Sequence, residues 1–457
     1  MKRTVSLILG ILAALSVLPF AAAGAAELPV YGDADGNGIC DAADVSALRT
    51  CLTGGESAVT ETADLNADGQ IDARDLTLLL RSLKGETAVM MVYLSGSTLE
   101  SDEELQCAAR DIEEMCAAQR SAGLRTVILT GGAEKWHTEY AKADENDRIE
   151  IAQEGVKSER FSEKLLNMGD AKTLGSFIQQ TAAQYPADHY SLVMWGHGTG
   201  PLWGMCYDSI FRDTLTLPEF RSGLEAGGVK FDWIGIDCCL MGTVETLKAV
   251  QGYADFMVAS EIRESKYGWK YDNFMTKWAR NPAISPAQLA MRIADDTVEG
   301  NAGETGSVQI ACYDVLQTDA LLDAYYAFAA ELIAALPEDN GTYYDFEMIP
   351  DFSQARYDIY DLDTMAEHIL FDRKIDGRTK TVPLDSAAAL REQISHTVYY
   401  NCTANMYEFG GIAVWFPRDS AEDGLRMREM LQPIGIDEAY ITMMETYFDS
   451  ISRIVID

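Results

Sequence analysis

The middle of the chain alternates short apolar runs with longer amphipathic stretches. The apolar runs predict buried strands at residues 88–94, 126–129, 190–195, 233–237 and 256–260. The amphipathic stretches between them predict helices at residues 102–119, 171–184, 217–226 and 243–250. Because strands and helices alternate, we expect an α/β fold in which helices cover both faces of a mostly parallel sheet.

The pattern is less regular toward the end of the chain. Residues 311–336 follow a long helical pattern, and residues 398–417 return to a strand pattern. Between them, residues 351–363 are acidic and aromatic. No chemistry follows from this last segment.

Residues 1–26 have the features of a signal peptide. Lys2 and Arg3 precede an apolar run at residues 5–20, and small residues at 21–26 offer cleavage sites. A membrane span is the alternative, but the run is short and no basic stop-transfer segment follows it. No later stretch reaches the ~18 uninterrupted apolar residues of a transmembrane helix. We therefore expect an exported protein without a membrane span.

Two acidic segments follow, DADGNGICDAAD at residues 33–44 and DLNADGQIDARD at residues 64–75. Position 6 of each is glycine, Gly38 or Gly69, where a calcium loop turns sharply around the ion. Positions 1, 3, 5, 9 and 12 carry oxygen-bearing side chains: Asp33, Asp35, Asn37, Asp41 and Asp44, then Asp64, Asn66, Asp68, Asp72 and Asp75.

This alternation suits calcium, which takes about six to eight oxygen ligands. Each segment precedes one short helical pattern, at residues 45–52 and 76–83. Asp, Asn and Gly also crowd ordinary turns, which is the alternative interpretation. Two copies with identical spacing favour two bound calcium ions.

Charge and cysteine content narrow the function further. The chain has 36 basic and 72 acidic residues, a formal net charge of −36. This balance argues against nucleic acid as a ligand, because phosphate binding relies on basic patches. The nine cysteines show no CxxC spacing, which argues against structural zinc. Their odd number leaves at least one free thiol.

His197 and Cys239 each fall just past the end of a predicted strand. Reactive groups of parallel sheets gather at such carboxyl ends, and a nucleophilic cysteine needs a base or an imidazolium beside it. Of the five histidines, only His197 directly follows a buried strand, and Gly196 and Gly198 flank it. A single strand-end histidine or cysteine is more often structural. The two together on successive strands predict a Cys-His hydrolase.

The duplicated loop-helix unit, with Asp at position 12, resembles a dockerin module, which docks enzymes onto the cohesin domains of a scaffold protein. The resemblance covers residues 30–84. It implies that loop positions 10 and 11 contact the cohesin; here they are Ala42 and Ala43, and Ala73 and Arg74.

Residues 88–417 resemble the clostripain family of caspase-like cysteine peptidases. The resemblance rests on WGHG at residues 195–198, DCCLM at 237–241, ASE at 259–261, GWKY at 268–271 and GGIAVWFP at 410–417. It implies that Cys239, directly before Leu240, is the nucleophile, with Cys238 as the alternative. His197 then protonates the leaving amine, and the backbone N–H groups of Gly198 and Cys239 stabilise the oxyanion.

Three further residues take roles from the same resemblance. Asp237 and Glu261 are expected to border a pocket for a basic side chain of the substrate. The alternatives are that Asp237 caps the following helix and that Glu261 lies on the surface. Arg212 is a candidate site of autoprocessing, or a solvated loop residue. The resemblance also implies a further calcium ion in the peptidase domain, whose ligands the sequence does not assign.

We therefore expect a signal peptide at residues 1–26, a small helical calcium-loop domain of the dockerin type at 30–84, and a caspase-like α/β domain at 88–457. The expected protein is a secreted, scaffold-associated cysteine endopeptidase that cleaves proteins after Arg or Lys. One alternative is an inactive binding protein on the same fold. Another is a Cys-His amidase or transpeptidase.

Overall fold

The computed structural model describes most of the chain, namely residues 32–37, 39–55, 58–65, 70–83, 85–281, 284–303, 306–335, 358–375, 378–406, 409–416 and 424–454. The expected signal peptide lies outside the described residues, as do Gly38, Asn66, Asp68 and Gly69 of the acidic segments. None of the described helices has the length and apolar character needed to cross a membrane.

A nine-stranded sheet forms the centre of the large domain, in the order β14-β10-β9-β8-β5-β1-β2-β3-β4. Its central strands are parallel: β1 (Ala88–Ser95), β2 (Leu124–Gly131), β5 (His189–Trp195), β8 (Phe231–Asp237) and β9 (Ala254–Ala259). The strands at the two edges pair antiparallel: β3 (Asp147–Ala152), β4 (Gly155–Arg160), β10 (Val308–Asp314) and β14 (Val398–Ala404).

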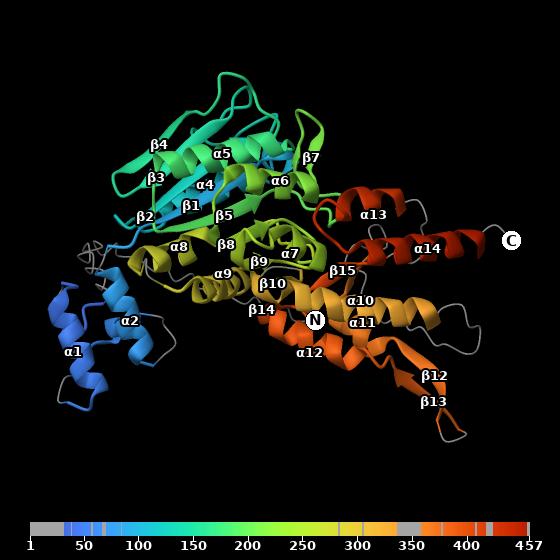
Figure 1. Ribbon diagram of the computed structural model, residues 1–457. Helices are drawn as coiled ribbons and strands as arrows, with labels where there is room; N and C mark the ends of the chain where they lie inside the picture. Colours follow the sequence, from blue (N-terminus) through green and yellow to red (C-terminus); the bar gives the residue numbers. More distant parts are fainter. Residues whose placement is uncertain are drawn as a thin grey trace, which may run out of the picture.

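Both faces of the central strands are buried, as the continuous apolar runs predict. Along β1, Val89, Met91 and Tyr93 belong to one core cluster, whereas Met90 and Val92 belong to the other. The first face is covered by α5 (Ala171–Gln184), α6 (Leu217–Gly227), α7 (Val244–Val250) and α10 (Thr318–Ala335). The second is covered by α4 (Cys107–Ala117), α8 (Tyr271–Arg280) and α9 (Pro286–Asn301) (Figure 1). The expected fold class is confirmed.

The helix predicted at residues 102–119 begins later in the structure than the sequence pattern indicates. A short helix, α3 (Ser97–Ser101), ends there, and α4 begins only at Cys107. The carboxylate of Asp102 accepts the N–H groups of Glu104 and Leu105, which closes a turn instead of a helix. Gln106 then adopts a left-handed conformation with φ of 47°. The hydrogen bonds of the Asp102 side chain therefore favour a turn at residues 102–106, although the hydrophobic pattern there is helical.

The helix predicted at residues 311–336 is wrong for its first part, which forms the end of β10. The carboxylate of Asp314 accepts the N–H of Leu316 and starts a 3₁₀ turn, Val315–Gln317, before α10. Because β10 is apolar on both faces, its sequence does not show the alternation of a half-buried strand. The strand predicted at 398–417 is broken in two, into β14 and β15 (Ala413–Trp415).

The C-terminal part of the peptidase domain contains β15 and several further elements. Strand β11 (Ile359–Asp361) pairs with it in a separate two-stranded sheet. The other elements are α11 (Leu362–His368), the projecting hairpin β12 (Leu370–Ile375) and β13 (Arg378–Pro383), α12 (Ala387–Thr397), α13 (Gly424–Leu431) and α14 (Glu438–Ile454) (Figure 1). A further hairpin, β6 (Met205–Asp208) and β7 (Asp213–Leu215), follows β5.

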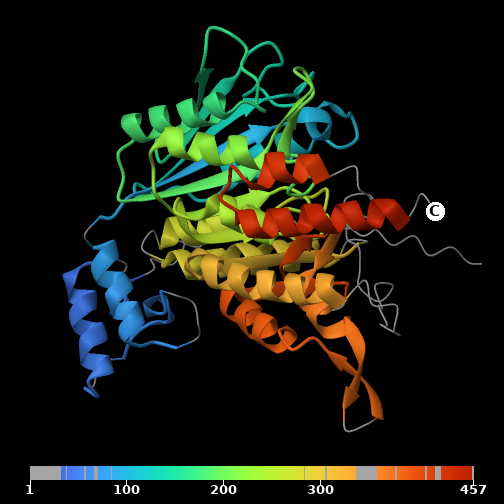
Figure 2. The same ribbon diagram turned by 45° about the vertical axis from the view of Figure 1, so that its right-hand side comes forward.

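The N-terminal domain consists of α1 (Ala42–Leu52), a 3₁₀ turn (Glu61–Ala63) and α2 (Ala73–Ser82). Its small core contains Val45 and Leu48 from α1, and Leu78 and Leu79 from α2. The domain lies beside the α8 end of the large domain in both views (Figures 1 and 2). There the side-chain amide of Asn281 donates to the carbonyl of Leu65.

Candidate active site

His197 and Cys239 lie at the same edge of the sheet. Strands β5 and β8 are adjacent and parallel, and Trp195 lies opposite Asp237 at their carboxyl ends. His197 follows two residues after Trp195, and Cys239 two residues after Asp237. The structure thus brings the two together as the sequence predicts for neighbouring strand ends.

Gly198 packs directly against the backbone of Cys239. A Cβ atom at Gly198 would lie 2.0 Å from the carbonyl oxygen of Cys239 and 2.8 Å from its nitrogen. Only glycine fits this close approach. The carbonyl of His197 accepts the N–H of Cys206, and the N–H of Thr199 donates to Gly204. Among the described residues, the Gly198 N–H between these bonds has no acceptor, as an oxyanion donor requires.

The imidazole of His197 is held by a threonine that sequence reasoning missed. Thr98, in α3 after β1, places its hydroxyl Oγ1 2.8 Å from His197 Nε2. Because Nε2 is taken, Nδ1 is the ring nitrogen left for the nucleophile. Burial lowers the pKa of His197, so the imidazole is neutral at pH 7.

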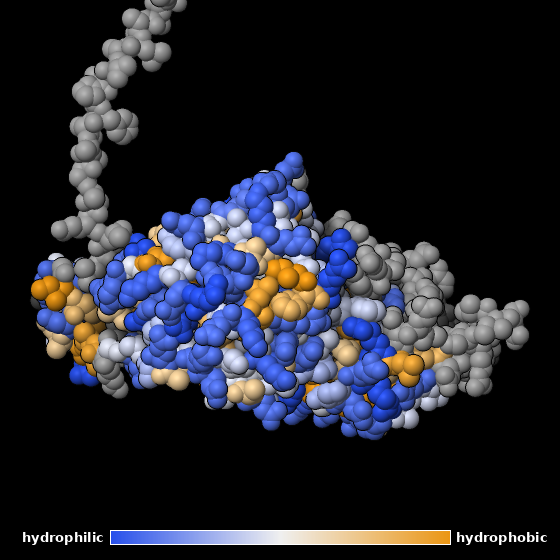
Figure 3. Space-filling model, turned by 90° about the horizontal axis from the view of Figure 1, so that it is seen from above, coloured by the Kyte–Doolittle hydropathy of each residue, from blue (hydrophilic) through white to orange (hydrophobic). Residues whose placement is uncertain are grey.

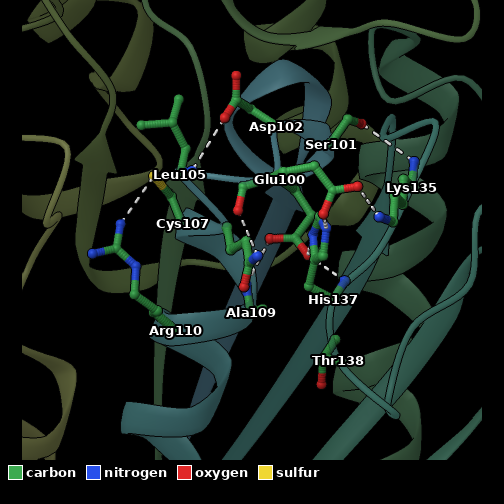
Figure 4. A network of polar contacts seen from close by, with 12 residues as sticks. Glu100, Ser101, Asp102, Leu105, Cys107, Ala109, Arg110, Lys135, His137 and Thr138 are labelled. Atoms are coloured by element: carbon green, nitrogen blue, oxygen red, sulfur yellow. Dashed lines mark hydrogen bonds and ion pairs between the residues drawn. The ribbon is translucent and has the colours of Figure 1, made fainter.

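A buried glutamate fixes the helix that carries Thr98. The Glu100 carboxylate accepts the N–H groups of Ala109 and His137, at 2.8 and 2.6 Å (Figure 4). The His137 ring lies between Glu100 and Glu103, 3.3 and 3.4 Å from their carboxylate oxygens. Burial is the main cause that raises the pKa of Glu100. This network joins α3, α4 and the loop after β2 into one support for the histidine.

The thiol of Cys239 accepts a hydrogen bond from the N–H of Glu264, with a distance of 3.3 Å. Burial raises the pKa of this thiol, and the Glu264 N–H opposes the rise. Cys238 differs, because its thiol points into the core and donates to the carbonyl of Met194. Its burial raises its pKa well above the usual value. This contrast favours Cys239 as the nucleophile.

Three interacting carboxyl groups lie near Cys239: Asp111 and Asp237 are buried, and Glu264 is half-buried. Asp237 accepts a hydrogen bond from the Tyr271 hydroxyl, at 2.8 Å, and Glu264 bonds to Asp237. The Trp195 indole N–H donates to Asp111 at 2.7 Å. Burial raises the pKa of each carboxyl, and the Asp237 charge raises those of Glu264 and Asp111 further. None of the three forms a salt bridge within the described residues.

Glu264 and Asp111 are the members of this group that the sequence did not reveal. Glu264 follows β9, so a carboxylate after a strand end was the available signal for it. Asp111 lies inside α4 and carries no such signal.

Glu261 is buried at a different place. Its carboxyl accepts the N–H of Gly411 at 3.1 Å and bonds to Asp361, which in turn accepts the N–H of Gly410. Burial, followed by the Asp361 charge, raises the pKa of Glu261 well above its usual value. The contacts of Glu261 therefore join β9 to the segment before β15. The surface alternative for Glu261 does not hold.

Arg212 lies at the exposed tip of the β6–β7 hairpin, beside Phe211. Its φ of 56° is unusual for a residue with a side chain. Among the described residues it forms no salt bridge.

The acidic loops fit a calcium ion where the structure describes them. Carboxylate oxygens of Asp33, Asp35 and Asp44 lie within 4.8 Å of one another. In both loops the position-12 carboxylate accepts the N–H of position 9, from Asp41 to Asp44 at 2.7 Å and from Asp72 to Asp75 at 2.8 Å. The two loops thus share one local geometry as well as one spacing.

Comparisons with known proteins agree with these two domains. Residues 92–408 match the Clostripain family, and residues 31–84 match the dockerin type I domain. The chain is 26% identical to clostripain from Hathewaya histolytica over 250 residues, which are 48% of this chain and 47% of that protein. It therefore spans about half the length of this curated relative.

Two solved structures share the fold. One is a secreted cysteine protease from Bacteroides thetaiotaomicron in complex with an irreversible peptide inhibitor, with a TM-score of 0.59, 16% identity, and coverage of 77% of this chain and 99% of that chain. The other is an inactive zymogen protease from Parabacteroides distasonis, with a TM-score of 0.54, 16% identity, and coverage of 80% and 96%.

The family match covers most of the large domain, including His197, Gly198 and Cys239. The dockerin match covers both acidic loops and both helices of the N-terminal domain. The chain therefore belongs to the clostripain family of cysteine peptidases and carries a type I dockerin domain ahead of its peptidase domain.

Proposed function

We propose that this peptidase is a secreted endopeptidase that cleaves proteins after arginine or lysine. The observation that carries this proposal is the group of carboxyls, Asp111, Asp237 and Glu264, near Cys239. Burial disfavours the ionised form of these carboxyls, and a guanidinium or ammonium that enters among them favours it. Arginine fits best, because its planar fork pairs with two carboxylates at once.

Little space is open on one side of Glu264. The cavity that borders Glu264, Gly268 and Trp269 holds only about 10 Å³, and neither Asp237 nor Cys239 lines it. Trp269 also donates its indole N–H to Glu264 at 3.3 Å. We propose that a basic side chain enters when the segment after β9 moves outward. This rearrangement makes the segment from Glu264 to Trp269 part of substrate recognition.

The proposed reaction uses Cys239 and His197 in two steps. The Cys239 sulfur attacks the scissile carbonyl while its proton passes to the neutral imidazole, because thiol and imidazole both start uncharged. The N–H groups of Gly198 and Cys239 receive the charge that develops on the oxygen. The imidazolium then protonates the leaving amine, and water hydrolyses the thioester, which restores the thiol.

Two other functions remain as competitors. An inactive binding protein on this fold has no need for the close Gly198–Cys239 contact or for the support of His197 by Thr98. An amidase or transpeptidase would use the same dyad with a different acceptor or substrate. The carboxyls near Cys239 favour cleavage after a basic residue over both.

Autoprocessing after Arg212 is part of the proposal. The residue is basic and exposed, and it lies in the hairpin between the two catalytic loops. The hairpin has to open before the Arg212 side chain reaches the pocket beside Cys239.

The dockerin domain is the part of the chain that would attach the peptidase to a scaffold protein. We propose that it binds two calcium ions, one in each loop, and a cohesin domain through α1 or α2. Ala42, Ala43, Ala73 and Arg74 are all exposed, as a contact surface requires. We propose that the protein is exported after removal of residues 1–26. The dockerin domain then spans residues 30–84, and the peptidase domain spans residues 88–457. A further calcium ion in the peptidase domain has no assigned ligands.

Calcium binding is tested by titration calorimetry on the full chain. We expect two strong sites, one of which is lost in Asp44→Ala and the other in Asp75→Ala. A site that persists in the double variant would be the ion of the peptidase domain. Unchanged binding in both single variants would contradict the assignment of the loops.

An electrophilic peptide probe that ends in arginine tests the catalytic assignment. After digestion and mass spectrometry, we expect the label on Cys239 in the wild type and none in Cys239→Ala. Cys238→Ala is the matched control, and it should be labelled like the wild type. Label on Cys238 in the Cys239→Ala variant would reverse the assignment.

A further inference from the structure

A groove of about 610 Å³ opens beside the histidine loop, away from Asp111, Asp237 and Glu264. Its walls come from the loop after β5, the β6–β7 hairpin, the start of α6 and α13, and include Thr199, Trp203, Arg212, Asp213, Glu219 and Arg426. Thr199 lies two residues after His197. The groove is therefore continuous with the loop that carries the general acid.

One exposed large hydrophobic residue lines this groove, and two others are next in sequence to lining residues. In the described part of the peptidase domain, four such residues are exposed: Trp203 at 36%, Phe211 at 45%, Leu425 at 80% and Leu316 at 77%. Trp203 lines the groove, and Phe211 and Leu425 each adjoin a lining residue, Arg212 and Arg426. The view from above shows a mostly hydrophilic surface with a limited hydrophobic area near its middle (Figure 3). Exposed apolar side chains that gather around a hollow mark a binding site.

The wall at Trp203 is held in place by its neighbours. The guanidinium of Arg426 lies 3.9 Å from the centroid of the Trp203 ring. Its Nε also donates to the carbonyl of Leu202 at 2.7 Å. The indole is thus fixed by a cation–π contact on one side. It offers its remaining exposed surface to an apolar ligand.

The acidic residues of the groove are already engaged. Asp213 accepts the side-chain amide of Asn167 at 2.6 Å. Glu219 accepts the N–H and the hydroxyl of Thr216 at the start of α6. Trp203 is the apolar residue in a lining that is otherwise polar or charged, so apolar packing in the groove depends on it.

The order of strands decides which part of a substrate reaches the groove. Along the sheet edge, Glu264 follows β9, Cys239 follows β8 and His197 follows β5. The arginine before the scissile bond goes to the carboxyls on the β9 side. The leaving amine goes to His197, because the imidazolium protonates it. The chain after the scissile bond therefore continues on the His197 side, where the groove begins.

We infer that this groove binds the substrate residues that follow the scissile bond and that Trp203 selects an apolar side chain among the first two of them. The inference rests on the proposed function, since it needs a peptide cleaved by the Cys239–His197 dyad. A cut after Arg212 would fall in one wall of the groove, whereas Trp203 and Arg426 lie outside the hairpin and form other walls.

The test uses two internally quenched peptides that are identical up to the arginine and continue with Leu-Phe or Ser-Gly. The measured quantity is the ratio of their kcat/KM values. For the wild type we expect a ratio of about ten in favour of Leu-Phe, as for a modest apolar contact. Trp203→Ala should lower the ratio to about one, and Trp203→Phe should restore most of it.

Leu316→Ala is the control, because it removes an exposed hydrophobic residue that does not line the groove and should keep the wild-type ratio. An arginine anilide has no amino acid after the scissile bond. Its hydrolysis therefore tests the proposed peptidase function separately from the role of the groove. If the wild type hydrolyses the anilide and cleaves both peptides at equal rates, this inference alone is overturned. The same holds if Trp203→Ala keeps the wild-type ratio of kcat/KM values. A wild type that cleaves neither the anilide nor the peptides would overturn the proposed function and this inference with it.

Discussion

Thr98 Oγ1 lies 2.8 Å from His197 Nε2, although 99 residues separate the two along the chain. The contact joins the loops after β1 and β5, which are neighbouring strands of the sheet. It fixes the ring so that Nδ1 is free to act on the nucleophile. A catalytic dyad in which a third residue orients the base is a recurring solution in nucleophilic enzymes.

Removal of the Thr98 hydroxyl should lower catalysis without loss of the fold. Thr98→Val keeps the shape and deletes one hydrogen bond, worth about 1 kcal/mol, so kcat should fall roughly fivefold to tenfold with little change in KM. Thr98→Ser keeps the hydroxyl and should stay near the wild type. Equal kcat for wild type and Thr98→Val, measured on an arginine anilide, would show that the contact has no role.

A methyl group at Gly198 should abolish activity. In Gly198→Ala the new Cβ would overlap the carbonyl of Cys239, so the two catalytic loops have to separate. We expect kcat/KM to fall by about a hundredfold or more, the size of a lost oxyanion donor. Gly303→Ala is the matched control, because nothing lies within 4 Å of its added Cβ. Full activity in Gly198→Ala would contradict the close contact.

Binding of a cation beside Asp237 should strengthen as pH rises. Burial raises the pKa of Glu264 well above its usual value, so this carboxyl keeps its proton to a higher pH than an exposed glutamate does. An entering cation favours the ionised form and releases that proton, so the binding constant grows by up to tenfold per pH unit. The inhibition constant of benzamidine, which stays cationic from pH 5 to 8, measures this effect.

In Glu264→Gln, residue 264 has no carboxyl proton to release when the cation binds. Its benzamidine affinity should be weaker than that of the wild type and vary less with pH. A wild-type inhibition constant that does not change over this range would contradict the assignment of Glu264 to the pocket.

The buried Glu261 should make the protein less stable in alkali. Its pKa is raised on folding, so between about pH 4.5 and the folded pKa the unfolded chain loses a proton that the folded chain keeps. The free energy of unfolding should therefore fall as pH rises, by up to about 1.4 kcal/mol per pH unit. Glu261→Gln keeps a donor toward Asp361 and does not titrate. Urea unfolding at pH 5 and pH 8 should show a smaller loss in this variant, and an equal loss would contradict the prediction.

The sequence was sufficient to place His197 and Cys239 at one edge of the sheet because its signals are local. His197 and Cys239 follow buried strands by two residues, and parallel strand ends meet at one edge. Thr98 and Asp111 could not be found in the same way. Each reaches the site through the packing of a helix, α3 or α4, against the sheet, and no short pattern encodes that packing.

Glu261 shows the same limit for a residue that the sequence did single out. Like Asp237, it lies at the end of a strand near Cys239, and the sequence predicts both at the substrate pocket. Glu261 instead contacts Gly411, which is 150 residues away. The orientation of a strand-end side chain thus depends on which distant segment covers it.

The most direct test of the account is cleavage of a peptide set that differs only in the residue before the scissile bond, with arginine, lysine, aspartate or asparagine there. The wild type should cleave after arginine at least about a hundredfold faster than after aspartate, because the pocket at Asp237 and Glu264 is acidic. Asp237→Asn should lose most of that preference while Cys239 is still labelled by iodoacetamide. Cleavage after arginine no faster than after aspartate would contradict the central claim.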